Sequence, residues 1–150
     1  MKKMWSVRLA RKEDASAIEM LIRFSARVLQ SSHCSEAQIE GAIGSVFGLD
    51  HQLLSDRTYF LAERKGEIVG CGGWSKRTTL FGGDAMKTEA DTELTPGCDS
   101  ARIRAFFVHP AWARCGIGLT LFFALAAVFP FKRLAIIASR SRVHDGQLNR

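Results

Sequence analysis

The segment with the clearest chemical character is the basic, glycine-bearing turn at residues 113–118, Ala-Arg-Cys-Gly-Ile-Gly. It stands between an apolar stretch that predicts a strand and a second apolar stretch that predicts a helix. The first N–H groups of a helix have no partner inside the helix and carry the positive end of its dipole. Gly116 and Gly118 would let a phosphate approach these groups, and Arg114 adds a side-chain partner. The turn is therefore a candidate cradle for a diphosphate.

Two glycines at a helix start are a weak signal by themselves, because a tight turn or close packing requires glycine as well. The spacing differs from the dinucleotide-binding pattern G-x-G-x-x-G, since the third position is Leu121. The Gly-Lys-Ser/Thr ending of a P-loop is also missing. The turn thus predicts anion binding without selecting the ligand.

The cysteines and histidines form no recognisable metal or disulfide pattern. The four cysteines contain no C-x-x-C pair, and the four histidines show no ligand spacing. The neighbours His33 and Cys34 are expected to be ordinary loop residues, so we expect no metal. Scattered thiols favour the reducing cytoplasm. The longest apolar run, residues 119–129, is too short to span a membrane.

The chain carries a formal net charge of +6. A basic protein suits a polyanionic ligand, and both nucleic acid and a nucleotide cofactor qualify. The basic residues are dispersed, so no nucleic acid is expected as a partner. A basic nucleic-acid-binding domain remains an alternative that rests on the net charge and on the basic residues of 132–150.

The hydropathy pattern predicts a single domain over residues 1–150, with elements in the order β-α-α-β-β-β-α-β. A first helix begins at Asp14 and carries an apolar stripe as far as Leu29. A second begins at a capping box, Ser35 to Gln38, and extends to Gly48. Strands are expected at 5–9, 58–64, 67–74, 101–108 and 132–138, and a third helix at 116–129.

The strand–turn–helix–strand order near the end predicts a parallel strand pair within a mixed sheet, hence an α/β (mixed α+β) fold. Residues 75–100 show no periodicity and are expected to form a long mobile connection, a candidate substrate lid. The helix segment 119–129 has no charged residue, so we expect it to be buried on all sides. Residues 139–150 are a basic tail.

The strand at 101–108 ends in Val108-His109-Pro110, and the glycine turn follows at once. This arrangement resembles the GNAT superfamily of N-acetyltransferases, in which a strand ending in V-x-P leads into the turn [QR]-x-x-G-x-[GA] at a helix start. The resemblance covers residues 5–138 and includes the first strand and the central hairpin. Ala113 and Cys115 depart from the pattern, because Gln or Arg is commonest at the first of these positions and a basic residue is usual at the second.

The resemblance implies a GNAT-like mixed sheet, acetyl-coenzyme A as co-substrate, and transfer of its acetyl group to a primary amine of a small molecule or peptide. It implies that the backbone of 106–108 lines the pantetheine arm and that N–H groups of 114–120 hold the pyrophosphate. The implied cofactor-binding residues are Phe106, Phe107, Val108, Arg114, Cys115, Gly116, Ile117, Gly118, Leu119 and Thr120.

The sequence does not identify the catalytic residues. The reaction needs an N–H donor for the developing oxyanion, for which Phe107 or Val108 is the candidate. Members of the family often use a Tyr after the fifth strand as the acid, whereas the only tyrosine of this chain is Tyr59. Among candidate bases, three carboxylates are expected to be ordinary surface groups and one histidine a structural loop residue: Asp50, Asp56, Glu63 and His109.

The family usually continues with one or two more strands, so the last strands are expected to be missing and the strand at 132–138 to have an unpaired edge. Together with the apolar helix, this predicts either a homodimer through residues 119–138 or a truncated or frame-altered C-terminal end. The alternative to an active acetyltransferase is therefore a non-catalytic or degenerate acyl-CoA-binding relative.

Overall fold

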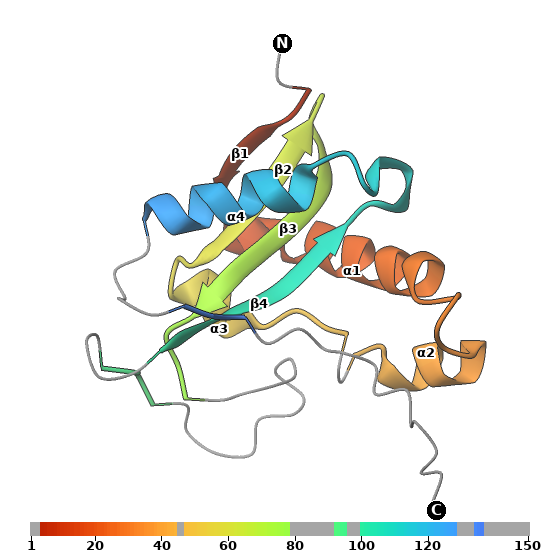
Figure 1. The fold of residues 1–150 in the computed structure, drawn as a ribbon, viewed down its shortest axis with the longest axis horizontal. Helices are drawn as coiled ribbons and strands as arrows, with labels where there is room; N and C mark the ends of the chain where they lie inside the picture. Colours follow the sequence, from red (N-terminus) through yellow and green to blue (C-terminus); the bar gives the residue numbers. More distant parts are fainter. Residues whose placement is uncertain (1–3, 45–46, 79–91, 96–99, 129–133, 137–150) are drawn as a thin grey trace, which may run out of the picture.

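The computed structural model describes residues 4–44, 47–78, 92–95, 100–128 and 134–136. The described residues form one sheet of five strands in the order β1-β2-β3-β4-β5, and Figure 1 shows the first four side by side. Neighbours run antiparallel except for β4 and β5, which are parallel, so the predicted mixed sheet is confirmed. The strands span Ser6–Leu9 (β1), Tyr59–Arg64 (β2), Glu67–Ser75 (β3), Ala101–Val108 (β4) and Leu134–Ile136 (β5).

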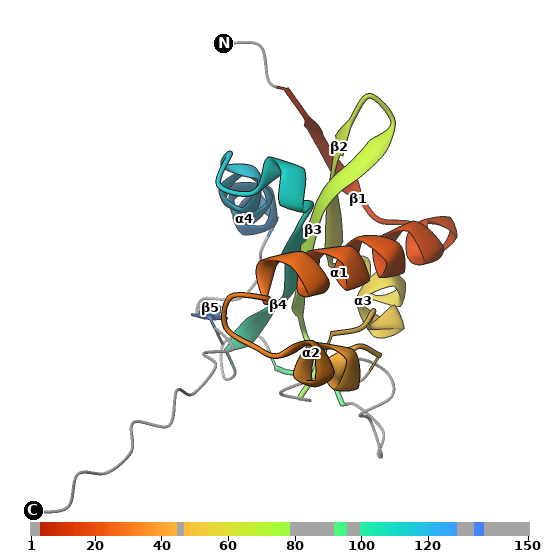
Figure 2. The same ribbon diagram turned by 90° about the vertical axis from the view of Figure 1, so that its right-hand side faces the viewer.

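Helices cover both faces of this sheet. Figure 2 shows α1 and α3 on one face and α4 on the opposite face. Two hydrophobic clusters correspond to these faces, one packed beneath α1 and α3 and the other beneath α4. The helices span Ala15–Leu29 (α1), Glu36–Ala42 (α2), His51–Ser55 (α3) and Ile117–Ala127 (α4).

The interior strand β2 shows why the sheet has a core on each side. Tyr59 and Leu61 belong to the cluster under α1, whereas Phe60 and Ala62 belong to the cluster under α4. Side chains alternate between the two faces of a strand. A stretch of strand covered on both faces must therefore be apolar at successive positions, as β2 is from Tyr59 to Ala62 before it ends in two charged residues.

The second helix is shorter than predicted, and an unexpected short helix follows it. α2 begins at the capping box of Ser35 but ends at Ala42 instead of Gly48. The backbone leaves the helix at Ile43, whose ψ of 130° is extended, and Gly44 follows with a left-handed φ of 91°. α3, which the sequence did not predict, begins where the Asp50 carboxylate accepts a hydrogen bond from the backbone of the helix.

Within the single chain, the last helix, α4, is buried along one stripe and not on all sides as expected. Ile117, Leu121 and Leu125 are buried against the sheet, whereas Leu119 and Phe123 are 60% and 62% exposed. A helix lying on a sheet contacts it along one stripe, so an apolar sequence leaves the opposite stripe in solvent. Leu29, at the end of the apolar stripe of α1, is likewise 37% exposed.

The long connection at 75–100 lies mostly outside the described residues, and so does the candidate lid. Its described flanks meet each other, because Arg77 and Glu93 form an antiparallel bridge and Leu94 is buried. The predicted last strand is present as β5, and the basic tail at 139–150 lies outside the described residues.

Candidate active site

The turn between β4 and α4 has the backbone that an anion cradle requires. A 3-10 turn, Pro110–Trp112, leads from the end of β4 to Arg114 and Gly116. Both residues have left-handed backbone, with φ of 64° and 92°. Glycine adopts this conformation freely, whereas arginine rarely does. Turns of this kind can aim successive backbone N–H groups at one point.

The N–H groups at the start of α4 are available to a ligand. The N–H of Thr120 donates to the carbonyl of Gly116 at 3.0 Å. Within the described residues, the N–H groups of Ile117, Gly118 and Leu119 take part in no hydrogen bond, as is usual in the first turn of a helix. A Cβ added at Gly118 would meet no atom within 4 Å, so the space beside these groups is open.

Thr120 differs from the other residues implied for the pyrophosphate. Its N–H is already bonded, and its hydroxyl donates to the same carbonyl of Gly116 at 3.0 Å. Arg114 and Cys115 are exposed, and Ile117 is buried with only its backbone at the turn. The structure therefore brings residues 114–119 together around the open helix start, with Thr120 stabilising the first turn.

β4 contains an extra residue relative to β3, and this bulge was not predicted. Cys71 is paired with Phe107 and Gly73 with Arg104, so β4 uses one more residue than β3 over the same span. Ala105 at the bulge has a φ of 55°, which is unusual for a residue other than glycine.

The bulge is held from below by the only tyrosine of the chain. The hydroxyl of Tyr59 donates to the carbonyl of Ala105 at 2.9 Å and lies 3.2 Å from the sulfur of Cys71. Tyr59 is 0% exposed. Burial, with smaller effects of Cys71 and Asp50, raises its pKa well above the ordinary value. Tyr59 therefore positions β4 and is closed off from any substrate.

Beyond its first three residues, the outer edge of β4 has no strand partner among the described residues, because β5 pairs only with Ala101–Ile103. The direction of the N–H groups along this edge follows from one bond, in which the N–H of His109 donates to the carbonyl of Val69 on β3 at 2.8 Å. N–H groups alternate between the two sides of a strand. The N–H of Phe107 thus faces β3, and that of Val108 faces the outer edge.

Two of the candidate bases are buried in ion pairs, so the expectation of surface carboxylates is wrong for them. The side chain of Asp50 is 3% exposed and lies 3.1 Å from Arg104. The side chain of Asp56 is 5% exposed and lies 2.6 Å from Arg77. The local cause is α3, because Asp50 precedes its first residue and Asp56 follows its last.

The other two candidates are also engaged. Glu63, on β2, pairs with Arg8 of β1 at 2.8 Å. His109 has the structural role that was predicted, since its Nδ1 accepts a hydrogen bond from the N–H of Ala111 at 3.1 Å. Its ring also packs edge-on against Phe24, with 5.2 Å between the ring centroids.

The fold and the turn before α4 agree with one family. Residues 22–139 match the model of the acetyltransferase (GNAT) family. The chain belongs to the GNAT family. It is therefore a GNAT-type acetyltransferase, and acyl transfer is its general chemistry. A search of curated proteins finds no match in sequence.

Solved structures of similar fold are themselves GNAT acetyltransferases. One is the PaiA N-acetyltransferase from Thermoplasma acidophilum in complex with coenzyme A, at 16% identity and a TM-score of 0.59, where the match covers 83% of this chain and 70% of that one. Another is the ribosomal-protein-alanine N-acetyltransferase from Brucella melitensis biovar Abortus 2308, at 19% identity and a TM-score of 0.55, covering 92% and 82% of the two chains. A GNAT acetyltransferase from Brucella melitensis in complex with acetyl-CoA matches at 17% identity and a TM-score of 0.52, covering 92% and 78%.

Neither a metal-binding cluster nor a membrane-spanning helix occurs among the described residues. No group of three or more His, Cys, Asp or Glu side chains in that part of this GNAT chain could hold a metal ion. No helix in that same part is long and apolar enough to cross a membrane.

Proposed function

We propose that this protein transfers the acetyl group of acetyl-CoA to a primary amine of a small molecule or peptide. The observation that carries the proposal is the start of α4, where three N–H groups without partners among the described residues adjoin open space. A 3-10 turn and the glycine turn connect this start to the β4 edge at which the N–H of Val108 faces outward. The neighbours with coenzyme A or acetyl-CoA in their structures support the choice of cofactor.

In the proposed complex, backbone groups of 114–119 hold the pyrophosphate and the outer edge of 106–108 binds the pantetheine arm. Charge-assisted hydrogen bonds to such donors contribute on the order of 1.5–3 kcal/mol each. Arg114 adds its guanidinium to the same anion. This arrangement directs the thioester along β4, toward the bulge at Ala105.

The transfer itself requires little from side chains. The amine nitrogen uses its lone pair to form a bond to the acetyl carbon, the negative charge moves to the carbonyl oxygen, and the N–H of Val108 stabilises it. The carbon–sulfur bond then breaks, coenzyme A leaves as a thiolate, and the proton of the amine neutralises that thiolate directly or through water. A thiol has a pKa of about 8.5, so the thiolate leaves without a strong acid.

The inaccessibility of Tyr59 keeps a second candidate function open, that of a non-catalytic acyl-CoA-binding relative. Isothermal titration with acetyl-CoA tests the binding that both candidates require. An assay of free coenzyme A, in which a thiol reagent detects its release in the presence of each of a panel of amines, distinguishes the two candidates. The proposed function predicts amine-dependent release, whereas binding without release would favour the second candidate.

The assignment of Val108 is tested by Val108→Pro. Because this N–H faces the outer edge, proline removes the donor without breaking a bond to β3. We expect kcat to fall by about 10²–10³-fold, as for the loss of one oxyanion donor, with binding of coenzyme A largely retained. Phe107→Pro is the contrasting variant, since it should break the sheet and lower the melting temperature. An unchanged kcat in a folded Val108→Pro protein would exclude this donor.

A cytoplasmic location remains part of the proposal. It is supported by the cysteines that the structure describes, Cys34, Cys71 and Cys115, all of which are free thiols. Burial raises the pKa of the Cys71 thiol to about 12, so this cysteine is unreactive within the core.

A further inference from the structure

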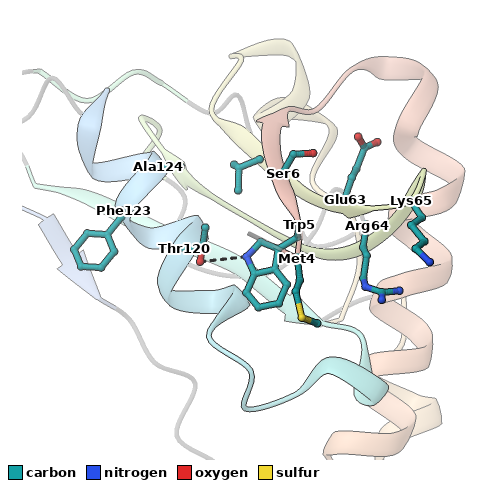
Figure 3. Close-up of a pocket in the computed structure, with 10 residues that line it drawn as sticks. Met4, Trp5, Ser6, Glu63, Arg64, Lys65, Thr120, Phe123 and Ala124 are labelled. Atoms are coloured by element: carbon teal, nitrogen blue, oxygen red, sulfur yellow. Dashed lines mark hydrogen bonds between the residues drawn. The ribbon is translucent and has the colours of Figure 1, made fainter. Parts of the chain in front are cut away.

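A pocket of about 910 Å³ lies between α4 and the N-terminal end of β1. Figure 3 shows its walls, which come from β1 and the residue pair before it, from the turn between β2 and β3, and from one flank of α4. Its volume is within the usual range for small-molecule sites, roughly 300–1,000 Å³. Nothing in the proposed acetyl transfer uses this space.

The pocket is distinct from the surfaces assigned to the cofactor. Of the residues implied for acetyl-CoA, only Thr120 lines it. The N–H and the hydroxyl of Thr120 both donate to the carbonyl of Gly116, and the hydroxyl oxygen accepts the indole N–H of Trp5 at 3.3 Å. These groups are engaged within the protein, so the character of the pocket is set by residues that the acetyl transfer does not use.

One wall of the pocket is apolar and aromatic. The hydrogen bond to Thr120 ties the ring of Trp5 to α4, so its orientation is fixed before a ligand arrives. Met4 and Phe123 extend the apolar wall and are 52% and 62% exposed. A flat ring whose polar group is already bonded presents its face for packing against another ring.

Two cations stand at the other side of the pocket, as Figure 3 shows. Lys65 forms no ion pair within the described residues. The guanidinium carbon of Arg64 lies 4.4 Å from the ring centroid of Trp112, and this packing by the face leaves the N–H edges of the guanidinium available. The one carboxylate that lines the pocket, Glu63, is neutralised by Arg8 at 2.8 Å.

The two sides of the pocket together select a ligand with two parts. A planar ring can pack against Trp5, and a carboxylate carried by that ring can accept paired hydrogen bonds from Arg64, with the charge of Lys65 beside it. A neutral aromatic molecule would leave both cations without an anion. A small inorganic anion would leave the apolar wall in water, where its exposure is unfavourable.

We propose that this pocket is a second ligand site, which binds an aromatic carboxylate with its ring on Trp5 and its carboxylate at Arg64 and Lys65. The site is separate from the one at which the acetyl group is transferred. The inference does not depend on the proposed function, because none of the contacts that carry it belongs to the cofactor or to the amine.

The experiment compares 2-naphthoate with its neutral analogue 2-naphthamide by isothermal titration in the absence of coenzyme A. The native protein should bind 2-naphthoate with a Kd below about 1 mM and at least about tenfold more tightly than the amide, which corresponds to one charge-assisted hydrogen bond. The double variant Arg64→Met/Lys65→Met should lose this preference while its affinity for the amide stays nearly unchanged. Lys12→Met, which removes one exposed charge elsewhere, is the matched control and should keep the preference.

The aromatic wall is tested by Trp5→Phe and Trp5→Ser. The serine variant should bind both probes roughly tenfold more weakly than the phenylalanine variant, because it loses the apolar area of the ring and the contact between rings. Melting temperatures show whether each variant is folded. If Trp5→Ser unfolds, the comparison of the native protein with the arginine and lysine variant still decides the case.

Equal affinity of the native protein for the two probes, or the same preference in the double variant as in Lys12→Met, would overturn the inference. A titration in the presence of saturating coenzyme A tests whether the site is separate, and 2-naphthoate should still bind. Displacement of 2-naphthoate by coenzyme A would overturn a separate site. Binding of 2-naphthoate by a protein that does not bind coenzyme A would overturn the proposed function and support this inference.

Discussion

At Gly118, a side chain would be compatible with the fold but not with the proposed ligand binding. It is the second residue of α4, and a Cβ there would meet nothing in the protein. Leucine is a better helix former than glycine by roughly 0.5–1 kcal/mol. We therefore expect Gly118→Leu to leave the free energy of unfolding unchanged or higher, while the branched side chain occupies space needed by the pyrophosphate and weakens coenzyme A binding by at least about tenfold.

Gly41→Leu is the matched control for this prediction. Gly41 lies within α2, and an added Cβ also meets nothing within 4 Å. Thermal melts and titration with coenzyme A should show a similar gain in stability and an unchanged Kd. If Gly118→Leu binds coenzyme A as tightly as Gly41→Leu does, the pyrophosphate does not lie at this turn.

Asp56 makes a pH-dependent contribution to stability. Burial works to raise the pKa of this carboxyl, but hydrogen bonds from Arg77 and Gln52 outweigh burial and hold the pKa below its ordinary value of 3.8. The unfolded chain therefore takes up the proton first as the pH falls. The stabilisation is fully present above pH 3.8 and is lost as the pH drops through the lower pKa of the folded state.

We expect Asp56→Asn to lower the free energy of unfolding at pH 7 by about 1–3 kcal/mol and to flatten its decline below pH 4. Urea unfolding at several pH values measures both effects. Glu40→Gln is the control, since Glu40 pairs with Arg27 at 2.7 Å with both side chains about half exposed, and such surface pairs contribute little. Equal pH profiles for Asp56→Asn and the native protein would contradict the assignment.

Among the elements, the position of α4 depends on how closely it approaches β3. A Cβ added at Gly70 would lie 2.5 Å from the Cγ2 of Ile117, so the helix start would have to move. We expect Gly70→Ala to cost about 1–3 kcal/mol in stability and to weaken coenzyme A binding, because the N–H groups of 117–119 move with the helix.

The double variant with Ile117→Ala is the test of this mechanism. It removes the clashing methyl group but keeps the backbone N–H, so it should recover part of the binding that Gly70→Ala loses. Titration of both single variants and of the double variant gives the coupling between the two sites. Additive losses would show that α4 does not move as expected.

The elements differ in how far the sequence determines them. β4 and the hairpin β2–β3 follow directly from their apolar runs and from the Lys65-Gly66 turn, and they agree with the predicted ranges to within a residue. The sequence contains no signal for the bulge at Ala105, because the left-handed residue there is an alanine. The hydrogen-bond partner of this residue, Tyr59, is 46 residues distant along the chain. α2 ends before the apolar period does, because the backbone is extended at Ile43 and left-handed at Gly44.

The same contrast applies to the candidate site. The turn at 113–118 could be singled out from the sequence because the anion cradle proposed there uses local backbone, encoded by two glycines and a helix start. The pocket beside Trp5 was not, because its residues come from three separate elements that meet only in the folded sheet. The buried pairs of Asp50 and Asp56 were missed for the same reason, since arginines far along the chain complete them.

For the whole molecule, we propose the outer stripe of α4 as the contact for a second copy of the chain. Leu119 and Phe123 are exposed there, and Ala126 lies on the same stripe with no charge nearby on the helix. We expect light scattering to show a dimer at micromolar concentration and Ala126→Glu to give a monomer, because it would bury two like charges at a two-fold contact. Glu36→Ala on α2 is a control that should remain dimeric. A monomeric native protein would exclude this arrangement.

The left-handed backbone of Arg114 has a consequence for how the turn responds to its surroundings. Its φ of 64° costs roughly 1–2 kcal/mol in a residue with a side chain, so the isolated fold would be more stable with glycine at this position. The strain is present before any ligand arrives, because it lies in the backbone. In the proposed complex the exposed guanidinium of Arg114 adds to the positive field at the turn, so raising the salt concentration should slow cofactor capture more than it hastens release.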